Sequence, residues 1–204
     1  DIEQTLDLWT GIITSKYKLG GVPVTVTTAS DPNSDTIGVG IVSELVAQGK
    51  LRGRLALPRG NDQNVKKTPP LDWSKPESHS SKAELPDLIL REVGESRYFA
   101  ALSTSLVPES NQVPHTWWLR ASPAQQTLEF TIEFCASREF RGQRSRFDTV
   151  TEKSATHWQR FWQSGAAVDF SGSKNPLAEK FEQRVILSRY LTAVQCVADF
   201  PPQE

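Results

Sequence analysis

Few residues in this sequence have the type and spacing that chemistry requires. The histidines His79, His115 and His157 are far apart in the chain, and so are Cys135 and Cys196. No pair of them has the spacing of a metal site. The chain also lacks GxSxG, HExxH, a P-loop and a glycine-rich nucleotide motif. We therefore expect neither a metal nor another cofactor.

The best candidates for ligand contact are Trp73 and His79, which fall in a segment rich in Pro, Gly and Ser at residues 58–86. Alternation of apolar and polar residues lapses there, which predicts an unusually long loop, and such loops are commonly functional or disordered. Trp73 either pins this loop onto the domain or binds a ligand, because an indole gains most when packed or stacked. His79 alone is more simply interpreted as a surface histidine.

Carboxylates for glycosidic chemistry cannot be chosen from the sequence, since the criterion is their separation in space. Asp7, Asp169 and Glu204 lie near ordered apolar segments. Each also has a structural explanation, namely pairing at a strand end, turn formation or a solvated terminus. Composition and spacing alone name no catalytic residue.

Charge and hydropathy exclude two classes of partner. The 204 residues carry a net charge of −1, which argues against a general binder of nucleic-acid backbones. The arginine-rich stretch 138–146 is interpreted as a solvated connector that pairs with neighbouring acids. No apolar run approaches the ~20 residues of a membrane helix. Cys135 and Cys196 lie on an apparent strand and an apparent helix, so we expect buried free thiols.

Period-two patterning dominates up to about residue 136. Gly20-Gly21 separates two β-branched runs and predicts a hairpin, because its turn needs positive φ. Strands are also predicted near residues 2–8, 37–41, 51–57, 98–102, 116–119 and 127–134, the last being the clearest. Alternation with one polar face indicates antiparallel sheets packed on a core. The predicted fold class is therefore mainly β, an antiparallel β-sandwich followed by two helices.

The period becomes helical from about Thr149. The spacing of Trp158, Phe161 and Trp162 puts the two tryptophans on one face, and the first helix should end near Ser164-Gly165. Asn175-Pro176 predicts the start of a second helix. That helix carries a broad apolar stripe: Leu177, Phe181, Val185, Ile186, Tyr190, Val194 and Val197. It is too apolar to stand alone in water, so we expect it to pack against helices that the 204 residues do not supply.

Four stretches together resemble a family: residues 4–11 (QTLDLWTG), 23–28 (PVTVTT), 157–162 (HWQRFW), and 184–193 running on to 201–204 (PPQE). They are similar to six-hairpin glycosidases related to the maltose and kojibiose phosphorylases and acid trehalases. The resemblance implies an N-terminal β super-sandwich, a helical linker and an α/α toroid that holds the active site. A toroid carboxylic acid would then protonate the glycosidic oxygen while water or phosphate attacks from the other face.

The same resemblance implies a division of the chain. Residues 1–137 would be a sandwich incomplete at its N-terminus, residues 138–174 a linker with a helix, and residues 175–204 the first helix of a missing toroid. No catalytic residue is carried over, because the general acid of the family lies deep in the toroid. The remainder of the same polypeptide would be the main partner, and a homodimer stays open.

Roles of individual residues also follow from the resemblance. The 58–86 loop would reach toward the toroid's sugar pocket, with Trp73 as a stacking face and His79 as a hydrogen-bond donor. Gln203 and Glu204 would lie where the chain enters the pocket wall. Trp158, Phe161 and Trp162 would anchor the interface between sandwich and toroid.

Three functions remain in competition: the inert sandwich and linker of an inverting glycoside hydrolase or phosphorylase acting on α-linked sugars, a carbohydrate-binding β-sandwich module, and a structural or interaction domain without sugar contact. The long apolar helix argues against the second, and the tryptophan in the loop argues against the third. The compartment is not determined, with a secreted or periplasmic location slightly favoured.

Overall fold

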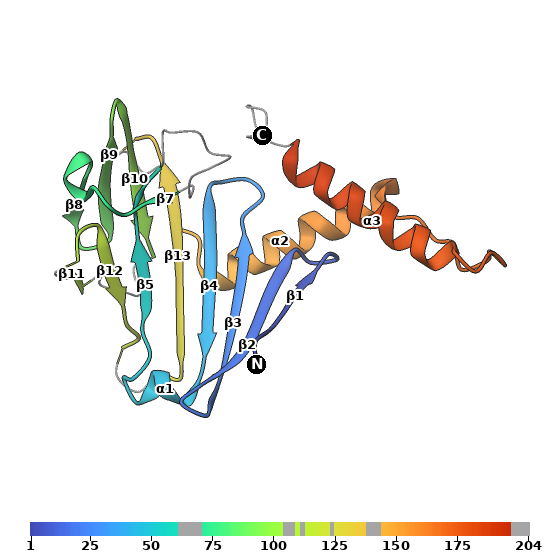
Figure 1. The fold of residues 1–204 in the computed structure, drawn as a ribbon, viewed down its shortest axis with the longest axis horizontal. Coiled ribbons are helices and arrows are strands. Elements are labelled where there is room, and N and C mark those ends of the chain that lie inside the picture. The colour runs from blue at the N-terminus through green and yellow to red at the C-terminus, as the bar shows by residue number, and fades with distance from the viewer. Residues whose placement is uncertain (61–70, 104–108, 111–112, 123–124, 138–143, 197–204) are drawn as a thin grey trace.

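The computed structural model describes residues 1–60, 71–103, 109–110, 113–122, 125–137 and 144–196, and it shows a mainly β chain (Figure 1). Its strands are β1 (Glu3–Asp7), β2 (Ile12–Leu19), β3 (Val22–Ser30), β4 (Thr36–Val42), β5 (Gly53–Ala56), β6 (Arg59–Gly60), β7 (Leu71–Asp72), β8 (Ser80–Leu85), β9 (Leu88–Val93), β10 (Ser96–Leu102), β11 (Glu109–Ser110), β12 (Thr116–Leu119) and β13 (Thr127–Cys135). Its helices are α1 (Glu44–Ala47), α2 (Phe147–Phe161) and α3 (Ala178–Gln195), with a 3-10 turn η1 (Pro76–Ser78) and a π-type turn η2 (Trp162–Ala166).

The strands form one large antiparallel sheet and a smaller one. The large sheet has eight strands in the order β1-β2-β3-β4-β13-β10-β9-β8, and the small sheet has three in the order β11-β12-β5. The short pair β6–β7 forms a third unit. Among the described residues, neighbouring strands in these sheets pair antiparallel throughout. The prediction of a mainly β, sandwich-like fold with helices after it is confirmed.

The hairpin β2–β3 is confirmed at the predicted glycines. Gly20 has φ 57° and Gly21 has φ 86°, the pair of positive values that a tight hairpin turn with right-handed strand twist requires. Leu19 pairs with Val22 across this turn. The glycine pair therefore fixes the register of the whole hairpin.

The main core lies between the large sheet and the small one. From β13 the buried side chains are Leu128, Phe130 and Ile132, and the small sheet contributes Trp117 and Leu119. These residues alternate along their strands, so one face of each sheet is removed from water. The strong period-two pattern that predicted β13 is the direct result.

The opposite face of the large sheet is covered by α2, which contacts β2, β3, β4 and β13. Close approach is possible because Gly38 and Gly40 of β4 point no side chain at the helix. A Cβ atom on Gly40 would lie 2.6 Å from the ring of Phe147, and one on Gly38 would lie 3.2 Å from Val150. Thr131, on the same face of β13, is only 2% exposed. β13 is thus buried on both faces at Thr131, whereas Glu129 on the same face as Thr131 stays exposed, as the half-buried sequence pattern predicts.

Hydrogen bonds to buried groups hold α2 in place. Lys153 Nζ lies 2.6 Å from Asp31 Oδ2, and the Asp31 side chain is 1% exposed. Ser154 Oγ donates to the carbonyl oxygen of Thr10 at 2.9 Å, and the Trp162 indole N–H donates to that of Leu8 at 2.6 Å. These contacts tie the helix both to the β3–β4 connection and to the turn after β1.

The predicted long loop at residues 58–86 is wrong for its described part. That part contains β6, β7, η1 and the complete edge strand β8. The alternation was missed because the half-buried positions of β8 include Ser81 and Glu84. The inward position at Ser81 is polar because it faces the buried Arg91 side chain.

Two smaller expectations also need correction. Both cysteines are free thiols as expected, but neither is fully buried: Cys135 is half-buried, and Cys196 at the end of α3 is exposed. In the arginine-rich stretch the predicted pairing with acids is found, because Arg146 is exposed and lies 3.6 Å from Asp148 and Arg144 contacts Asp87. The solvated position is wrong for Arg144, since its side chain is only 15% exposed and also contacts the Leu102 carbonyl oxygen. Arg138 and Arg141 lie outside the described residues.

The helix α3 extends beyond the β1 side of the large sheet (Figure 1). Asn175 Oδ1 accepts a hydrogen bond from the Leu177 N–H at 2.9 Å, so the predicted start of this helix is confirmed within two residues. No residue of α3 is buried. In the part of the chain that the structure describes, no helix is both long and apolar enough to cross a membrane.

We predict that Gly40→Val weakens the packing of α2 on the sheet. The new side chain must displace Phe147, and overpacking of this kind costs about 1–3 kcal/mol of unfolding free energy. Urea denaturation followed by tryptophan fluorescence measures the change. Gly172→Val is the matched control, since a Cβ there meets nothing within 4 Å. Equal stability of the two variants would show that α2 does not depend on the bare face of β4.

Candidate functional site

Alternating arginine and tryptophan side chains lie on the outer face of the small sheet. The guanidinium carbon of Arg52 is 3.7 Å from the ring centroid of Trp118, and that of Arg54 is 5.7 Å from the ring centroid of Trp73. Arg54 and Trp118 are also directly opposite one another across β5 and β12. We call Arg52, Trp118, Arg54 and Trp73 the Arg–Trp row. Its order follows from period-two alternation, because Leu55 and Trp117 point to the core instead.

Local hydrogen bonds hold Trp73 in position. Oδ1 of Asp72 accepts from the backbone N–H of Ser74 at 2.8 Å and from its hydroxyl at 2.6 Å. These bonds keep the pKa of Asp72 below its ordinary value, because the charged carboxylate is the form they stabilise. The resulting Asx turn presents the Trp73 side chain with 54% of its surface exposed. A rigid turn with an exposed indole is suited to contact with a ligand.

Behind this region lies a polar cluster built around Arg91 of β9. The Arg91 side chain is fully buried and donates to the carbonyl oxygens of Ser80 at 3.0 Å and Pro58 at 2.8 Å. It also donates to Ser81 Oγ at 3.0 Å and contacts Nδ1 of His79. Among the described residues, its Nε has no hydrogen-bond partner. Within the same described part of the chain no carboxylate bonds to this cation, so carbonyl and hydroxyl oxygens and the His79 ring replace its water.

His115 extends the cluster toward η1. Its Nε2 lies 2.8 Å from the carbonyl oxygen of Pro76, and its Nδ1 lies 2.9 Å from Ser81 Oγ. Its ring centroid is 3.9 Å from that of His79. The backbone of His115 has a positive φ of 56°, which is uncommon outside glycine. The two hydrogen bonds at its ring and the unusual backbone conformation therefore hold His115 in one orientation.

The cluster holds His79 in its neutral form. Burial and, to a smaller extent, the positive charge of Arg91 together lower its pKa to about 4. An arginine can only donate hydrogen bonds, so Nδ1 of His79 must accept and the ring must be uncharged. His79 is thus engaged inside the fold, and its ring is not free to serve as a cationic donor to a ligand near neutral pH.

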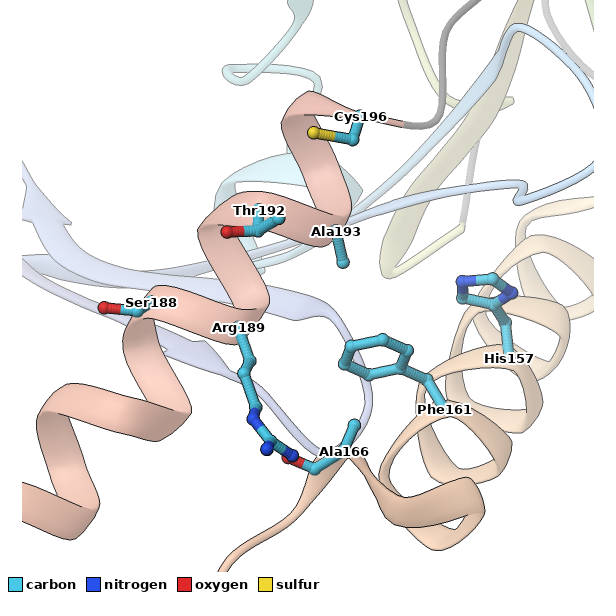
Figure 2. Close-up of a pocket in the computed structure, with 8 residues that line it drawn as sticks. All are labelled: His157, Phe161, Ala166, Ser188, Arg189, Thr192, Ala193 and Cys196. Carbon is cyan, nitrogen blue, oxygen red and sulfur yellow. The ribbon is translucent and has the colours of Figure 1, made fainter.

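A second feature is an open, mainly apolar groove between α2 and α3, with a volume of about 590 Å³. Figure 2 shows His157 and Phe161 of α2 on one side, and Ala193 and Cys196 of α3 on the other. Arg189 closes one end, where it donates to the carbonyl oxygens of Gly165 at 2.8 Å and Ala166 at 2.6 Å. The groove is therefore lined by side chains of both helices and stays open between them.

The predicted interface residues Trp158, Phe161 and Trp162 lie between the sheet and α3. Trp162 is 4% exposed and faces the turn after β1. Trp158 contacts both sides, since a Cβ on Gly11 would lie 2.2 Å from its ring and its centroid is 4.7 Å from that of Tyr190. Burial against this ring layer raises the pKa of Tyr190 above its ordinary value. These aromatic side chains anchor α3 to the sheet through α2.

The structure brings some predicted site residues together and separates others. Trp73 and His79 lie in the same folded segment, but only Trp73 is well exposed. Gln203 and Glu204 lie outside the described residues. Arg52, Arg54 and Trp118 were missed as surface partners of Trp73. The alternation that placed Leu55 inward already placed both arginines outward, but it could not pair them with a tryptophan from a distant strand.

Within the described ranges, no group of three or more His, Cys, Asp or Glu side chains is arranged to hold a metal ion. The Arg–Trp row provides cations and aromatic faces, and the helical groove provides an apolar surface. No protein-family profile matches the chain, and no curated protein matches it with significant similarity.

We predict that His79 makes the fold sensitive to acid. Its folded-state pKa of about 4 is below the ordinary value of 6.5, so the unfolded chain binds more protons between these values. This contribution to stability is complete above about pH 6.5 and is lost as pH falls toward 4. The urea midpoint, measured from pH 7 to pH 4, should therefore fall less steeply in His79→Gln than in the wild type.

The control for this prediction is His157→Gln, which removes an exposed histidine outside the cluster. It should keep the wild-type dependence on pH. If His79→Gln also keeps that dependence, the Arg91 cluster does not hold His79 neutral.

Proposed function

We propose that this chain is the β-sandwich and helical linker of a carbohydrate-active enzyme, an inverting glycoside hydrolase acting on α-linked sugars. It would contribute no catalytic group of its own. Support comes from the resemblance of four sequence stretches to six-hairpin glycosidases and from the sandwich-like fold followed by helices. The observation that carries the proposal is the apolar surface of α3, which is exposed among the described residues.

The exposed apolar side chains of α3 form a continuous stripe. Leu187, Leu191 and Val194 are 49%, 48% and 39% exposed, and their spacing of four and three residues puts them on one side of the helix. Phe181 is 58% exposed in an earlier turn. A helix with this much apolar surface gains stability from a helical neighbour on its outer side. An α/α toroid is a domain that would supply such neighbours.

In this proposal the chemistry belongs to the helical domain. A carboxylic acid of that domain would protonate the glycosidic oxygen, and a second carboxylate would activate the attacking water. The present chain would hold the first helix in a fixed orientation. Trp158 and Trp162 support that role, because they connect α3 to α2 and α2 to the sheet.

The test compares the natural polypeptide that contains these residues with the 204-residue chain alone. We expect the natural polypeptide to continue into a helical domain and to hydrolyse an α-linked disaccharide with inversion at the anomeric carbon, followed by NMR. The 204-residue chain should be inactive. A natural polypeptide that ends at Glu204, or one with retention of configuration, would contradict the proposal.

A substitution on α3 tests whether a helical domain packs against its apolar side. Leu187→Glu should lower the unfolding free energy of the natural polypeptide by about 2–4 kcal/mol, because it buries a charge without a partner. In the 204-residue chain the same change should have little effect, since Leu187 is exposed there. Lys180→Glu is the control on the same helix. Equal effects of Leu187→Glu in both polypeptides would mean that nothing packs on this side of α3.

A second candidate function is a carbohydrate-binding module. The specific observation that favours it is the exposed Trp73 ring held by the Asx turn beside Arg54. Under this alternative the 204-residue chain binds a sugar without the helical domain. The two functions are compatible in one protein, since the Arg–Trp row and α3 are different surfaces.

A further inference from the structure

In the part of the chain that the structure describes, the two arginines of the Arg–Trp row are cations held by aromatic rings and not by an acid. Arg52 and Arg54 are exposed, and each guanidinium lies over an indole ring. Among the described residues neither makes a salt bridge to a carboxylate, unlike Arg97, which lies 4.0 Å from Glu92. Stacking on the ring restricts the guanidinium plane and leaves its N–H edge available. This arrangement is suited to an anion that arrives from solution.

Trp73 adds an apolar flat surface at the end of the same row. Its ring is about half exposed and its backbone is held by the Asp72–Ser74 turn. The C–H face of a pyranose ring matches an indole in size and polarity, and such contact costs little side-chain entropy when the indole is already held. One ligand that offers both an apolar ring face and an anionic group is an acidic sugar.

Other ligands fit this surface less well. A neutral sugar would use Trp73 but leave both guanidiniums without a partner. A nucleic acid would need a wider basic surface, and the whole chain has a net charge of −1. Carboxylate and sulfate groups on a sugar both suit a guanidinium, which can donate two parallel hydrogen bonds to either.

We propose that the Arg–Trp row binds an anionic sugar chain, with Trp73 stacked on a pyranose ring and Arg54 and Arg52 paired with its carboxylate or sulfate groups. This inference rests on the proposed carbohydrate function and narrows its ligand to acidic sugars. It requires no contribution from α3, so it is tested on the 204-residue chain, and its failure leaves the hydrolase proposal standing.

The experiment is isothermal titration calorimetry with trigalacturonate and with its methyl ester. The ester keeps the sugar chain but replaces each charged carboxylate with a neutral methyl ester, so we expect it to bind at least about tenfold more weakly. Sulfated and unsulfated dextran oligosaccharides form the second pair. If only this pair shows a difference in affinity, the anionic group that the row binds is sulfate. Equal binding of charged and neutral members in both pairs, or no binding at all, overturns the proposal.

Variants then assign the binding to the row. Arg54→Gln and Trp73→Ala should each weaken binding of the preferred sugar by about tenfold, the value expected for the loss of one charge-assisted or stacking contact. Far-UV circular dichroism checks the fold of each variant. Arg97→Gln is the matched control, because Arg97 also lies near an aromatic ring, that of Phe99, at 5.8 Å.

Arg97→Gln should bind like the wild type. Loss of affinity in this control equal to that of Arg54→Gln would assign the binding to overall charge and overturn the proposal. Polyphosphate of similar charge is the last probe. Binding of polyphosphate as tight as that of the sugar, or wild-type affinity in Trp73→Ala, would likewise show that no sugar ring is recognised.

Discussion

The contact between α2 and the bare face of β4 determines how the rest of the molecule is arranged. Gly38 and Gly40 let Val150 and Phe147 approach the backbone of the large sheet, and Gly11 does the same for Trp158. Each of these contacts lies on the face opposite the main core. A single helix therefore converts a sheet with one wet face into a layer covered on both sides in its central strands. The price of such close packing is sensitivity to any added side chain at these glycines.

The polar cluster around Arg91, near the opposite edge of the sheet, stabilises a buried charge. The Arg91 side chain is fully buried, and a buried cation requires several oxygen or nitrogen partners. Those partners come from the connection that contains Pro58 and from η1 and β8, through Ser81 and His79. Segment 71–85 is therefore held to the edge of the sheet by hydrogen bonds rather than by apolar burial. The same attachment fixes the turn that presents Trp73.

The sequence allowed prediction of the elements whose burial is apolar and regular. The β2–β3 hairpin, β13, α2 and the start of α3 all follow from periodicity, glycine pairs or caps. β8 was missed because its inward side chains include Ser81, and β9 gave no alternation because Ile89 and Leu90 are buried on opposite faces. His79 was interpreted as a surface residue because nothing in the sequence places Arg91 beside it. The Arg–Trp row depends in the same way on strand pairing between distant segments.

The two candidate surfaces lie at opposite ends of the molecule. In Figure 1 the small sheet with β5 and β12 is at one end, and α3 is at the other beyond β1. The sheet between them is an uninterrupted ladder of antiparallel pairs, and α3 is joined to it through Trp158 of α2. A helical domain packed on α3 alone would leave the Arg–Trp row open to solvent. For Trp73 to line a pocket in that domain, as the family resemblance implies, the domain would have to extend along the whole sheet. If the two proposals hold together, a row that binds its own sugar chain needs no such extension and would hold a sugar polymer at a distance from the catalytic groups of the helical domain.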